Sequence, residues 1–563
     1  MNYEDMSRED LLKEFNKLKR VQKYGLYWEE KPEDVDELLK TNYPVLTNLK
    51  EKDILQDNKS FNNVLIEGDN LHTLELLYIT HYEKIKLIYI DPPYNTGNKD
   101  FIYNDKFVDK EDSWKHSKWL SFMYRRLKIA RELLKDEGVI FISIDDNEFA
   151  QLKLLCNAVF DENNFVAVLP TVMNLKGNQD QFGFAGTHEY TLVYAKNKSL
   201  AKINEFDIDE EVLFDKWKED DIGFYKKGAN LKATGVNAPR EKRPNLYYPI
   251  YIDNKDNIHL ERKNEDDIEL LPITRGKEMS WRWSKEKINN EKHNVIIVRS
   301  RNKVSLYKKQ RPQIGDMPTK KPKTLFYKPE YSSGNGTGLL KEMFNGEKVF
   351  NNPKPLELIK DIIKLGSNKN DIILDFFAGS GTTAQAILEI NKEQADSNRK
   401  FILATNNEKD ICEKVCYPRL KKLLKGFIND KGEKINGYKE NLKYFRADMV
   451  GKNKNRDQMK VIMAQKIYDL LSIKENCFNL IEEEPYYRVY KQNNKVMGIY
   501  SFFTENYMEE FKKKIRNIEA EHKVVYSFSF TNHVKKEIFE DLKGVDIKAI
   551  PSKILQILDD LRK

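Results

Sequence analysis

The stretch Ile85-Lys86-Leu87-Ile88-Tyr89-Ile90 leads directly into Asp91-Pro92-Pro93-Tyr94. A largely apolar run of this length is typical of a buried strand in a parallel sheet. The tetrapeptide at its end supplies an acid, two rigid turn residues and an aromatic ring. Proline fixes φ and has no amide hydrogen, so the turn is stiff and its carbonyl groups are free to face a pocket. An ordinary strand-ending turn is the alternative, and the continuation Asn95-Thr96-Gly97 makes it less favoured.

The tetrapeptide is suited to holding a planar ring that carries an exocyclic amine. The lone pair of such an amine is delocalised into the ring, so the amine must be polarised before it can act as a nucleophile. The Asp91 carboxylate and the Pro92 carbonyl can accept both amine hydrogens and localise the lone pair. Tyr94 is placed to stack on the ring. We therefore expect a pocket formed by Asp91, Pro92, Pro93 and Tyr94.

A second motif lies far downstream. Ile372-Ile373-Leu374-Asp375 is typical of a short parallel strand, and it runs into Phe376-Phe377-Ala378-Gly379-Ser380-Gly381-Thr382-Thr383, with a helix expected from Ala384. Glycines between a strand and a helix let a cofactor approach the backbone, and the helix amino terminus binds polar groups. A glycine-rich turn alone is weak evidence. The chain has no Gly-Lys-Ser/Thr loop for a nucleotide triphosphate and no six-residue dinucleotide fingerprint.

Together the two motifs resemble those of the DNA amino-methyltransferases that use S-adenosylmethionine, in which D-P-P-Y binds the target base and F-x-G-x-G binds the cofactor. The base motif comes first and a long insert separates the two, as in the beta-type circular arrangement. Further matching segments follow in the expected order: Glu67-Gly68-Asp69-Asn70, Gly138 to Glu148, His188 to Asn197, Asn352-Pro353-Lys354-Pro355 and Tyr444 to Asp448. The subgroup with all of these is the modification subunit of Type III restriction-modification systems, and the resemblance covers about residues 60–480.

The resemblance implies an α/β fold, with a doubly wound Rossmann-like core, and S-adenosylmethionine as the cofactor. It implies site-specific methylation of adenine N6 in double-stranded DNA, with the target base flipped out. It also implies a homodimer that can join a helicase-nuclease restriction subunit. Asp91, Pro92, Pro93 and Tyr94 are assigned to the base, and the cofactor-binding residues are Asp69, Asp375, Phe377, Gly379, Gly381 and Glu408. The ribose ligand is open among Asn406, Asn407 and Glu408, because Phe401 to Glu408 has no clear register with the family pattern.

The hydrophobic periodicity divides the chain into five parts. Residues 1–59 are expected to form an amino-terminal helical segment, and 60–200 the first part of the methyltransferase core. Residues 201–345 interrupt the α/β pattern as an inserted target-recognition domain. The core resumes over 346–444, and 445–563 form a carboxyl-terminal α+β domain.

The inserted segment is where a DNA sequence would be read, because it interleaves basic residues with flat aromatic rings. These residues are Lys226, Lys227, Lys232, Arg240, Lys242, Arg243, Trp281, Arg282, Trp283, Arg299, Arg301, Lys308, Lys309, Arg311, Lys320, Lys321 and Lys323. The set favours DNA contact, whereas any single charge is as well explained by a solvated face. Trp281 and Trp283 are as suited to a core as to DNA wedges. The glycine run 334–338 is interpreted as a flexible linker rather than a phosphate cradle.

Composition agrees with this interpretation. The 563 residues include 96 Lys and Arg and 89 Asp and Glu, a net charge of only +7, so DNA binding would need a local basic face. The four cysteines show no zinc spacing and indicate a reducing compartment. No signal peptide or membrane-spanning stretch is evident, so we expect a cytoplasmic protein without membrane contact. No metal is expected, because Asp145 to Glu148 is typical of a helix cap, and His188 is not expected to act as a base.

Other functions stay open. The chain could be a stand-alone methyltransferase of adenine N6 or cytosine N4, although an acid in the first position of D-P-P-Y favours adenine. It could act on RNA or on a protein glutamine amide, or be a non-catalytic DNA-recognition subunit. The recognition sequence, the number of strands modified and the presence of a restriction partner are not determined by the sequence.

Overall fold

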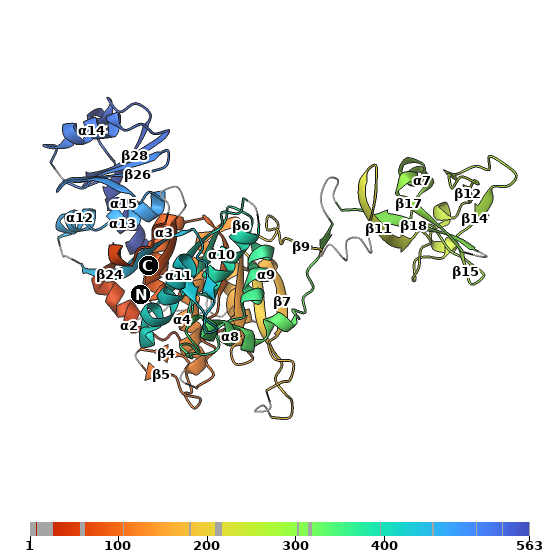
Figure 1. Cartoon of the computed structure of the whole chain (residues 1–563), viewed down its shortest axis with the longest axis horizontal. Helices are drawn as coiled ribbons and strands as arrows, with labels where there is room; N and C mark the ends of the chain where they lie inside the picture. Colours follow the sequence, from red (N-terminus) through yellow and green to blue (C-terminus); the bar gives the residue numbers. More distant parts are fainter. Residues whose placement is uncertain are drawn as a thin grey trace. The chain divides into compact units, whose positions relative to one another are not determined.

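A nine-stranded sheet carries both sequence motifs on neighbouring strands (Figure 1). In spatial order its strands are β1 (Asn42–Asn48), β24 (Asn441–Gly451), β2 (Asn62–Glu67), β21 (Lys400–Thr405), β20 (Ile372–Asp375), β3 (Ile85–Ile90), β6 (Leu134–Ile144), β8 (His188–Ala195) and β7 (Phe165–Val172). The strands from β24 to β6 are parallel. The outer strands β1 and β8 pair antiparallel with β24 and β6, and β7 pairs antiparallel with β8.

The computed structural model describes residue 7 and residues 26–56, 62–98, 100–104, 106–178, 182–208, 217–300, 303–312, 318–394, 396–452, 455–502, 504–531 and 533–561. The helix expected around Leu11 to Leu18 lies outside these residues. The chain divides into two units, residues 1–204 with 323–563, and residues 205–322. None of the described helices is long and apolar enough to cross a membrane.

The two motif strands meet because β3 and β20 are neighbours, with Leu87 opposite Ile373 and Ile88 opposite Leu374. After β3 the chain continues to β6 on one side, whereas after β20 it continues to β21 on the other. Right-handed crossovers in opposite directions place their helices on opposite faces of the sheet. The boundary between β20 and β3 is therefore a topological switch point, where doubly wound sheets bind ligands beyond the carboxyl ends of their strands.

Two groups of helices pack around this sheet, as expected for the doubly wound α/β fold, which is confirmed. One group is α3 (Asn70–His81), α4 (Lys115–Leu133) and α5 (Phe149–Phe160), and the other is α9 (Leu356–Gly366), α10 (Thr382–Glu393) and α11 (Tyr417–Lys425). Helix α10 begins at Thr382, two residues before the expected start, because Gly381 adopts the left-handed φ of 80° and ends the turn there.

The prediction that residues 1–59 form a helical segment is wrong for the last part of that range. Only α2 (Asp34–Thr41) is an α-helix among the described residues before β1, and residues 42–48 form β1 itself. Strand β1 pairs along its length with β24, from Asn42 opposite Gly451 to Asn48 opposite Phe445. The boundary expected at residue 445 is also wrong, because it cuts through β24. Strand β1 and the extent of β24 both depend on pairing between residues about 400 positions apart. A local sequence pattern cannot reveal such pairing.

The carboxyl-terminal part forms a five-stranded sheet of its own. Its strands are β25 (Leu480–Glu483), β26 (Tyr487–Gln492), β27 (Lys495–Tyr500), β28 (His522–Ser529) and β29 (Val545–Pro551), and its helices are α12 (Arg456–Ala464), α13 (Tyr468–Glu475), α14 (Met508–Asn517) and α15 (Ser552–Asp560). Helix α14 buries Phe511 and Ile515 against β27 at Gly498, where a methyl group would lie 2.6 Å from both side chains. Helix α13 packs on α3 and β1, so this part shares the core of the first unit.

The unit of residues 205–322 contains two small antiparallel sheets. The larger consists of β10 (Lys218–Asp220), β11 (Gly223–Asn230), β18 (Lys303–Gln310) and β17 (Val295–Ser300), and the smaller of β13 (Ile258–His259), β12 (Ile250–Ile252) and β14 (Ile268–Leu270), with helix α7 (Lys285–Glu291). Short pairs are β9 (Phe206–Asp207) with β19 (Thr319–Lys320) and β15 (Ile273–Thr274) with β16 (Lys277–Glu278). Trp281 is 1% exposed and donates its indole hydrogen to the Tyr248 carbonyl, so it belongs to the core of this unit.

The expected insertion 201–345 is too long at both ends. The Asn204 amide donates to the carbonyls of Lys364 and Ser367, each at 3.0 Å, which ties it to the first unit. Phe326 exchanges backbone hydrogen bonds with Pro170 and Val172. The glycine run 334–338, expected to be a linker, lies inside helix α8 (Ser333–Met343). Gly336 allows α8 to approach the next segment, because a methyl group there would lie 2.2 Å from the Pro353 carbonyl oxygen.

Two further strand pairs complete the first unit. Strands β4 (Ile102–Tyr103) and β5 (Lys106–Phe107) form a small ribbon after the D-P-P-Y turn, and β22 (Phe427–Ile428) pairs with β23 (Lys434–Ile435) after α11. The ribbon of β4 and β5 stands beside the ligand cleft described below.

Candidate active site

A cleft of about 860 Å³ lies beyond the carboxyl ends of β3 and β20. Its volume is in the range of small-molecule and cofactor sites. Eight of the residues expected at the site line it: Asp69, Asp91, Pro92, Pro93, Tyr94, Phe377, Gly379 and Glu408. The fold therefore brings the two motifs, which are far apart in the sequence, to the walls of one cleft.

Two residues expected to bind the cofactor, Asp375 and Gly381, are not among the residues that line the cleft. The Asp375 side chain lies beneath the turn, where it accepts hydrogen bonds from Phe377 N at 3.0 Å and from Thr383 Oγ1 at 2.6 Å. Burial raises the pKa of Asp375 to about 7, and these two hydrogen bonds offset only part of that effect. Both residues therefore support the shape of the turn.

A buried lysine joins the catalytic motif to strand β8. Lys354 Nζ lies 3.2 Å from Asp91 Oδ1 and 3.0 Å from Glu189 Oε1, and it donates to the Tyr94 hydroxyl at 2.6 Å. The Tyr94 hydroxyl in turn donates to Glu189 Oε2 at 3.1 Å. Lys354 and Glu189 lie in segments that resemble the family pattern, but their sequence context predicted no function for them. The available signal was a lysine between two prolines and an acid at the start of an apolar strand.

The charges of this cluster support one another. Burial raises the pKa of Glu189, and Lys354 offsets part of that rise. Burial acts to lower the pKa of Lys354, but Asp91 and Glu189 outweigh it and the pKa rises. Burial, together with Asp91 and Glu189, holds the pKa of Tyr94 well above its usual value. Lys354 is therefore a cation and Tyr94 a neutral phenol at neutral pH.

The D-P-P-Y turn is held from behind by α4 and the exit of β6. Trp119 Nε1 donates to the Pro93 carbonyl at 2.7 Å, so that carbonyl is engaged within the protein. Asn95, at the left-handed φ of 57°, donates to Glu148 Oε1 at 2.6 Å. Glu148 is fully buried and also contacts His116 Nδ1 at 2.8 Å. These contacts fix the backbone on which Asp91 and Tyr94 are presented.

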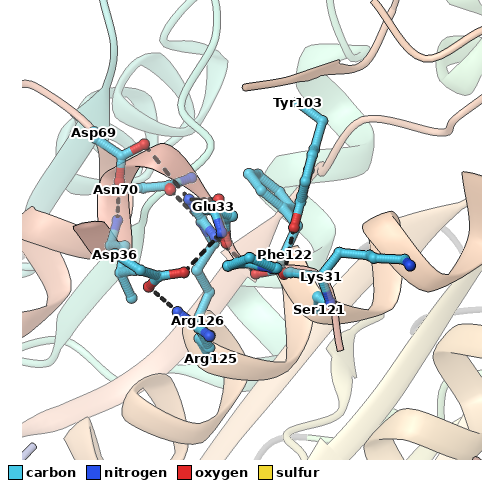
Figure 2. Close-up of polar contacts among 12 residues, drawn as sticks. Lys31, Glu33, Asp36, Asp69, Asn70, Tyr103, Ser121, Phe122, Arg125 and Arg126 are labelled. Atoms are coloured by element: carbon cyan, nitrogen blue, oxygen red, sulfur yellow. Dashed lines mark hydrogen bonds and ion pairs between the residues drawn. The ribbon is translucent and has the colours of Figure 1, made fainter. Parts of the chain in front are cut away.

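A second network surrounds Arg126 of α4 (Figure 2), and its members Glu33, Asp69 and Asn70 line the cleft. The fully buried guanidinium of Arg126 forms a bidentate pair with Glu33, with oxygen distances of 2.8 and 3.1 Å. It also donates to Asn70 Oδ1 at 2.5 Å and lies 3.5 Å from Asp69 Oδ2. Asn70 Nδ2 then donates to the Phe376 carbonyl at 3.2 Å, within the glycine-rich turn.

This network brings an amino-terminal segment to the cleft, because Glu33, Asp34 and Val35 all line it. The segment is attached to α4, since Lys31 N donates to Ser121 Oγ at 3.0 Å and Arg125 pairs with Asp36 (Figure 2). This part of the cleft was not predicted from the sequence, since nothing in residues 31–36 indicates a contact with α4.

The lining suits a cofactor that combines an aromatic base, a diol and a cationic sulfonium centre. Phe122 and Phe377 lie 5.8 Å apart between ring centroids and provide aromatic surface, while Asp69 and Glu408 provide carboxylates. Gly379 has φ 49°, and a methyl group there would come within 3.3 Å of the Phe350 ring. Of the three ribose candidates, Asn406 and Glu408 line the cleft, whereas Asn407 accepts a hydrogen bond from Glu413 N.

Two other acidic or basic positions are placed away from this chemistry. His188 is exposed and makes an edge contact with Tyr190, and it does not line the cleft. Asp145 accepts a hydrogen bond from Asn147 N at 2.9 Å, just before α5. In the described part of the chain, no group of three or more His, Cys, Asp or Glu side chains is arranged to hold a metal ion.

Several of the basic residues expected to contact DNA are engaged within the unit 205–322. Arg240, Arg299 and Arg311 are paired with acids of the same unit, Glu278, Asp256 and Asp220. The exposed basic residues include the paired Arg240 and Arg299, together with Lys227, Lys242, Arg243, Arg282, Lys320 and Lys321. Lys323 belongs to the first unit, and Arg301 lies outside the described residues. The exposed set is therefore smaller than the number of cations in the sequence indicates.

The model of the DNA methylase family that covers N6 and N4 methyltransferases matches residues 85–416, which include both motifs and the inserted unit. The chain belongs to this family. The chain is 46% identical to the Type III restriction-modification enzyme EcoPI Mod subunit of Escherichia phage P1, over 65% of this chain and 62% of that protein. It is 34% identical to the Type II methyltransferase M.KpnI of Klebsiella pneumoniae, over 64% of this chain and 84% of that protein.

The expected resemblance to Type III Mod subunits is thus confirmed, and the match spans about three fifths of the EcoPI Mod subunit. Among solved structures, the PvuII DNA methyltransferase (cytosine-N4-specific) is similar with a TM-score of 0.34 and 12% identity, over 65% of this chain and 88% of that one.

Proposed function

We propose that this DNA methylase transfers a methyl group from S-adenosylmethionine to N6 of adenine in double-stranded DNA, as the modification subunit of a Type III restriction-modification system. The observation that carries the proposal is the shared cleft, which is lined by Asp91 and Tyr94 of the first motif and by Phe377 and Gly379 of the second. A base and a methyl donor bound at these walls would meet at the switch point between β3 and β20.

For this reaction the chain must polarise the N6 amine of adenine and accept a proton from it. S-adenosylmethionine supplies an activated methyl group when it is bound. The Asp91 carboxylate and the Pro92 carbonyl accept the two amine hydrogens, which directs the nitrogen lone pair toward the methyl carbon. The amine that gains the methyl group would lose its extra proton toward the Asp91 carboxylate, which lies in hydrogen-bonding reach of N6 in this arrangement. Lys354 anchors that carboxylate at 3.2 Å.

The target base must leave the duplex to reach Asp91, which costs a few kcal/mol. Stacking of the base on Tyr94 offsets about 1–3 kcal/mol of this cost. The Tyr94 ring is held by its hydroxyl between Lys354 and Glu189, so it is oriented before the base arrives. Pre-orientation of this kind reduces the entropy lost on binding.

The remaining assignments concern partners. The exposed basic residues Lys242, Arg243, Lys320 and Lys321 support DNA reading by the unit 205–322. We also propose that the chain forms a homodimer, joins a helicase-nuclease restriction partner and works in the cytoplasm, and the similarity to the EcoPI Mod subunit supports this.

The proposal is tested by expressing the wild type and Asp91→Ala in a host without DNA methylation and mapping modified bases by long-read sequencing. We expect N6-methyladenine at one short asymmetric motif with the wild type and none with Asp91→Ala. Asp91→Ala should still bind S-adenosylmethionine in calorimetry, which separates catalysis from folding. Unmodified DNA from cells with soluble, cofactor-binding wild type would refute the proposal, and N4-methylcytosine would replace adenine as the substrate.

A further inference from the structure

The hairpin between β7 and β8 carries the two most exposed phenylalanines of the described residues. Phe182 and Phe184 are 103% and 86% exposed, whereas the next ones, Phe530 and Phe107, are 43% and 42% exposed. Leu175 on the opposite arm is 62% exposed. Two neighbouring aromatic rings in water are costly for a soluble protein and commonly mark an interaction site.

The base of this hairpin is held firmly by the core. Met173 N donates to Thr187 O at 2.9 Å, and Asn178 and Gly186 exchange backbone hydrogen bonds at 2.8 and 3.1 Å. Ser333 N of α8 donates to Met173 O at 3.0 Å. Phe184 therefore stands only two residues beyond a paired position, so its ring is presented on an ordered arm.

The same arm leads into the base pocket. Tyr190 pairs with Ile144, the last residue of β6, so Glu189 and His188 lie past the carboxyl end of that strand. That is the edge of the sheet where D-P-P-Y follows β3. Glu189 contacts Tyr94 and Lys354, and Phe184 lies five positions before it in the sequence, a reach of at most about 18 Å. In Figure 1 the hairpin extends beyond β7 on the side where β4 and β5 lie.

We propose that Phe182 and Phe184 form a DNA wedge that enters the base stack at the position vacated by the flipped target base. This inference rests on the proposed function, because it requires a base in the Asp91–Tyr94 pocket. Removing a base leaves its two stacking neighbours and its partner base without contact. Apolar side chains inserted between base steps restore such contact and stabilise the open duplex. An aromatic ring stacks on any base, so a wedge does not need to read the sequence.

The geometry favours duplex DNA over a protein as the occupant. The hairpin continues directly from strand β8, which supplies Glu189 to the pocket, and a base drawn into that pocket leaves its gap nearby. The arm also carries Lys176, and a cation beside aromatic rings suits a phosphate backbone. A second copy of the chain or another protein seated on these rings is an outcome of the test below.

The test compares Phe182→Ala/Phe184→Ala with the wild type on two synthetic duplexes that carry the methylation site mapped in genomic DNA. In one duplex the target adenine is paired with thymine, and in the other it lies opposite an abasic site, where flipping needs less disruption. Transfer of tritiated methyl groups gives the rate, and 2-aminopurine at the target position reports flipping by its fluorescence. Phe530→Ala is the matched control, because it removes an exposed phenylalanine from the carboxyl-terminal part.

We expect the double variant to lose about tenfold or more in rate on the paired duplex, with reduced 2-aminopurine fluorescence, and less than about threefold on the abasic duplex. Phe530→Ala should match the wild type on both. Equal loss on both duplexes, or wild-type rates throughout, would overturn the wedge while leaving the proposed function intact. A change of oligomeric state in the double variant, without substrate dependence, would assign the rings to a protein interface and overturn the wedge. A wild type that methylates neither duplex, and no cellular DNA, overturns the proposed function and the wedge with it.

Discussion

Replacing Lys354 by methionine tests the charge arrangement of the base pocket most directly. Methionine retains much of the side-chain volume but removes the ammonium that lies 3.2 Å from Asp91 and 3.0 Å from Glu189. Two carboxylates are then left facing each other without a cation. The Lys354 side chain is 10% exposed and Glu189 is 12% exposed, so solvent screens the lost interaction only weakly.

The expected loss can be worked from these contacts. Removing one partner of a buried ion pair costs about 3–5 kcal/mol. Asp91 is 28% exposed, so we take the lower end, about 3 kcal/mol. If that cost falls on the base-bound complex, kcat/KM decreases about 100-fold, since about 1.4 kcal/mol corresponds to a factor of ten.

The pH dependence gives a readout that a simple packing defect would not produce. Lys354 acts to lower the pKa of Glu189, so its removal raises that pKa further. Glu189 is then protonated up to a higher pH, and protonation relieves the repulsion from Asp91. The rate of Lys354→Met relative to wild type should therefore be higher at pH 6 than at pH 8.5.

Methyl transfer to a duplex carrying the mapped site, measured from pH 6 to 8.5, provides the assay. Lys348→Met is the control, because Lys348 lines the same cleft but is exposed. A Lys354→Met enzyme within fivefold of wild type, with the same pH profile, would show that the ammonium has no part in holding the pocket.

Three further predictions concern the elements around the cleft. Gly336→Ala should reduce methylation about tenfold and lower the melting temperature, because its methyl group would lie 2.2 Å from the Pro353 carbonyl that precedes Lys354. Gly338 lies in the same helix, but a methyl group there meets nothing within 4 Å, so Gly338→Ala should be neutral or stabilise the fold by up to about 1 kcal/mol. Equal effects of the two alanines would contradict this. Arg126→Met should cost about 3–5 kcal/mol of stability and weaken S-adenosylmethionine binding in calorimetry, whereas Arg125→Met removes a partly exposed pair with Asp36 and should cost no more than about 1 kcal/mol. Similar binding constants for both variants would argue against the network. The pKa of Asp375 is raised by burial to about 7 from 3.8, so its protonated form stabilises the fold fully below pH 3.8 and this contribution is lost as the pH rises through 7. The free energy of unfolding of Asp375→Asn, measured in urea without cofactor, should therefore rise by about 4 kcal/mol relative to that of the wild type between pH 4 and pH 8. Asp457→Asn, at an exposed position, is the control. Parallel pH profiles of Asp375→Asn and wild type would disprove this prediction.

The sequence by itself determined the features that local strings encode. An apolar run before Asp91-Pro92-Pro93-Tyr94 and another before the glycine-rich turn specified two buried strands, β3 and β20, with polar groups at their ends. Alternating strands and helices specified the doubly wound fold, since parallel strands need helical crossovers. The two motifs were sufficient to predict the family, and the match of the family model over residues 85–416 confirms that prediction.

Only the tertiary structure decided which distant residues complete the cleft. Lys354 and Glu189 meet Asp91 because the segment that precedes α9 and the first residues of β8 reach the turn that follows β3. Glu33 meets Arg126 because the amino-terminal segment packs on α4. The glycine run 334–338 became helical and residues 42–48 became a strand through contacts with Pro353 and β24. In each case the deciding free energy comes from burial and pairing between segments far apart in the chain. Such contacts outweigh local propensity and leave no periodic trace in the sequence.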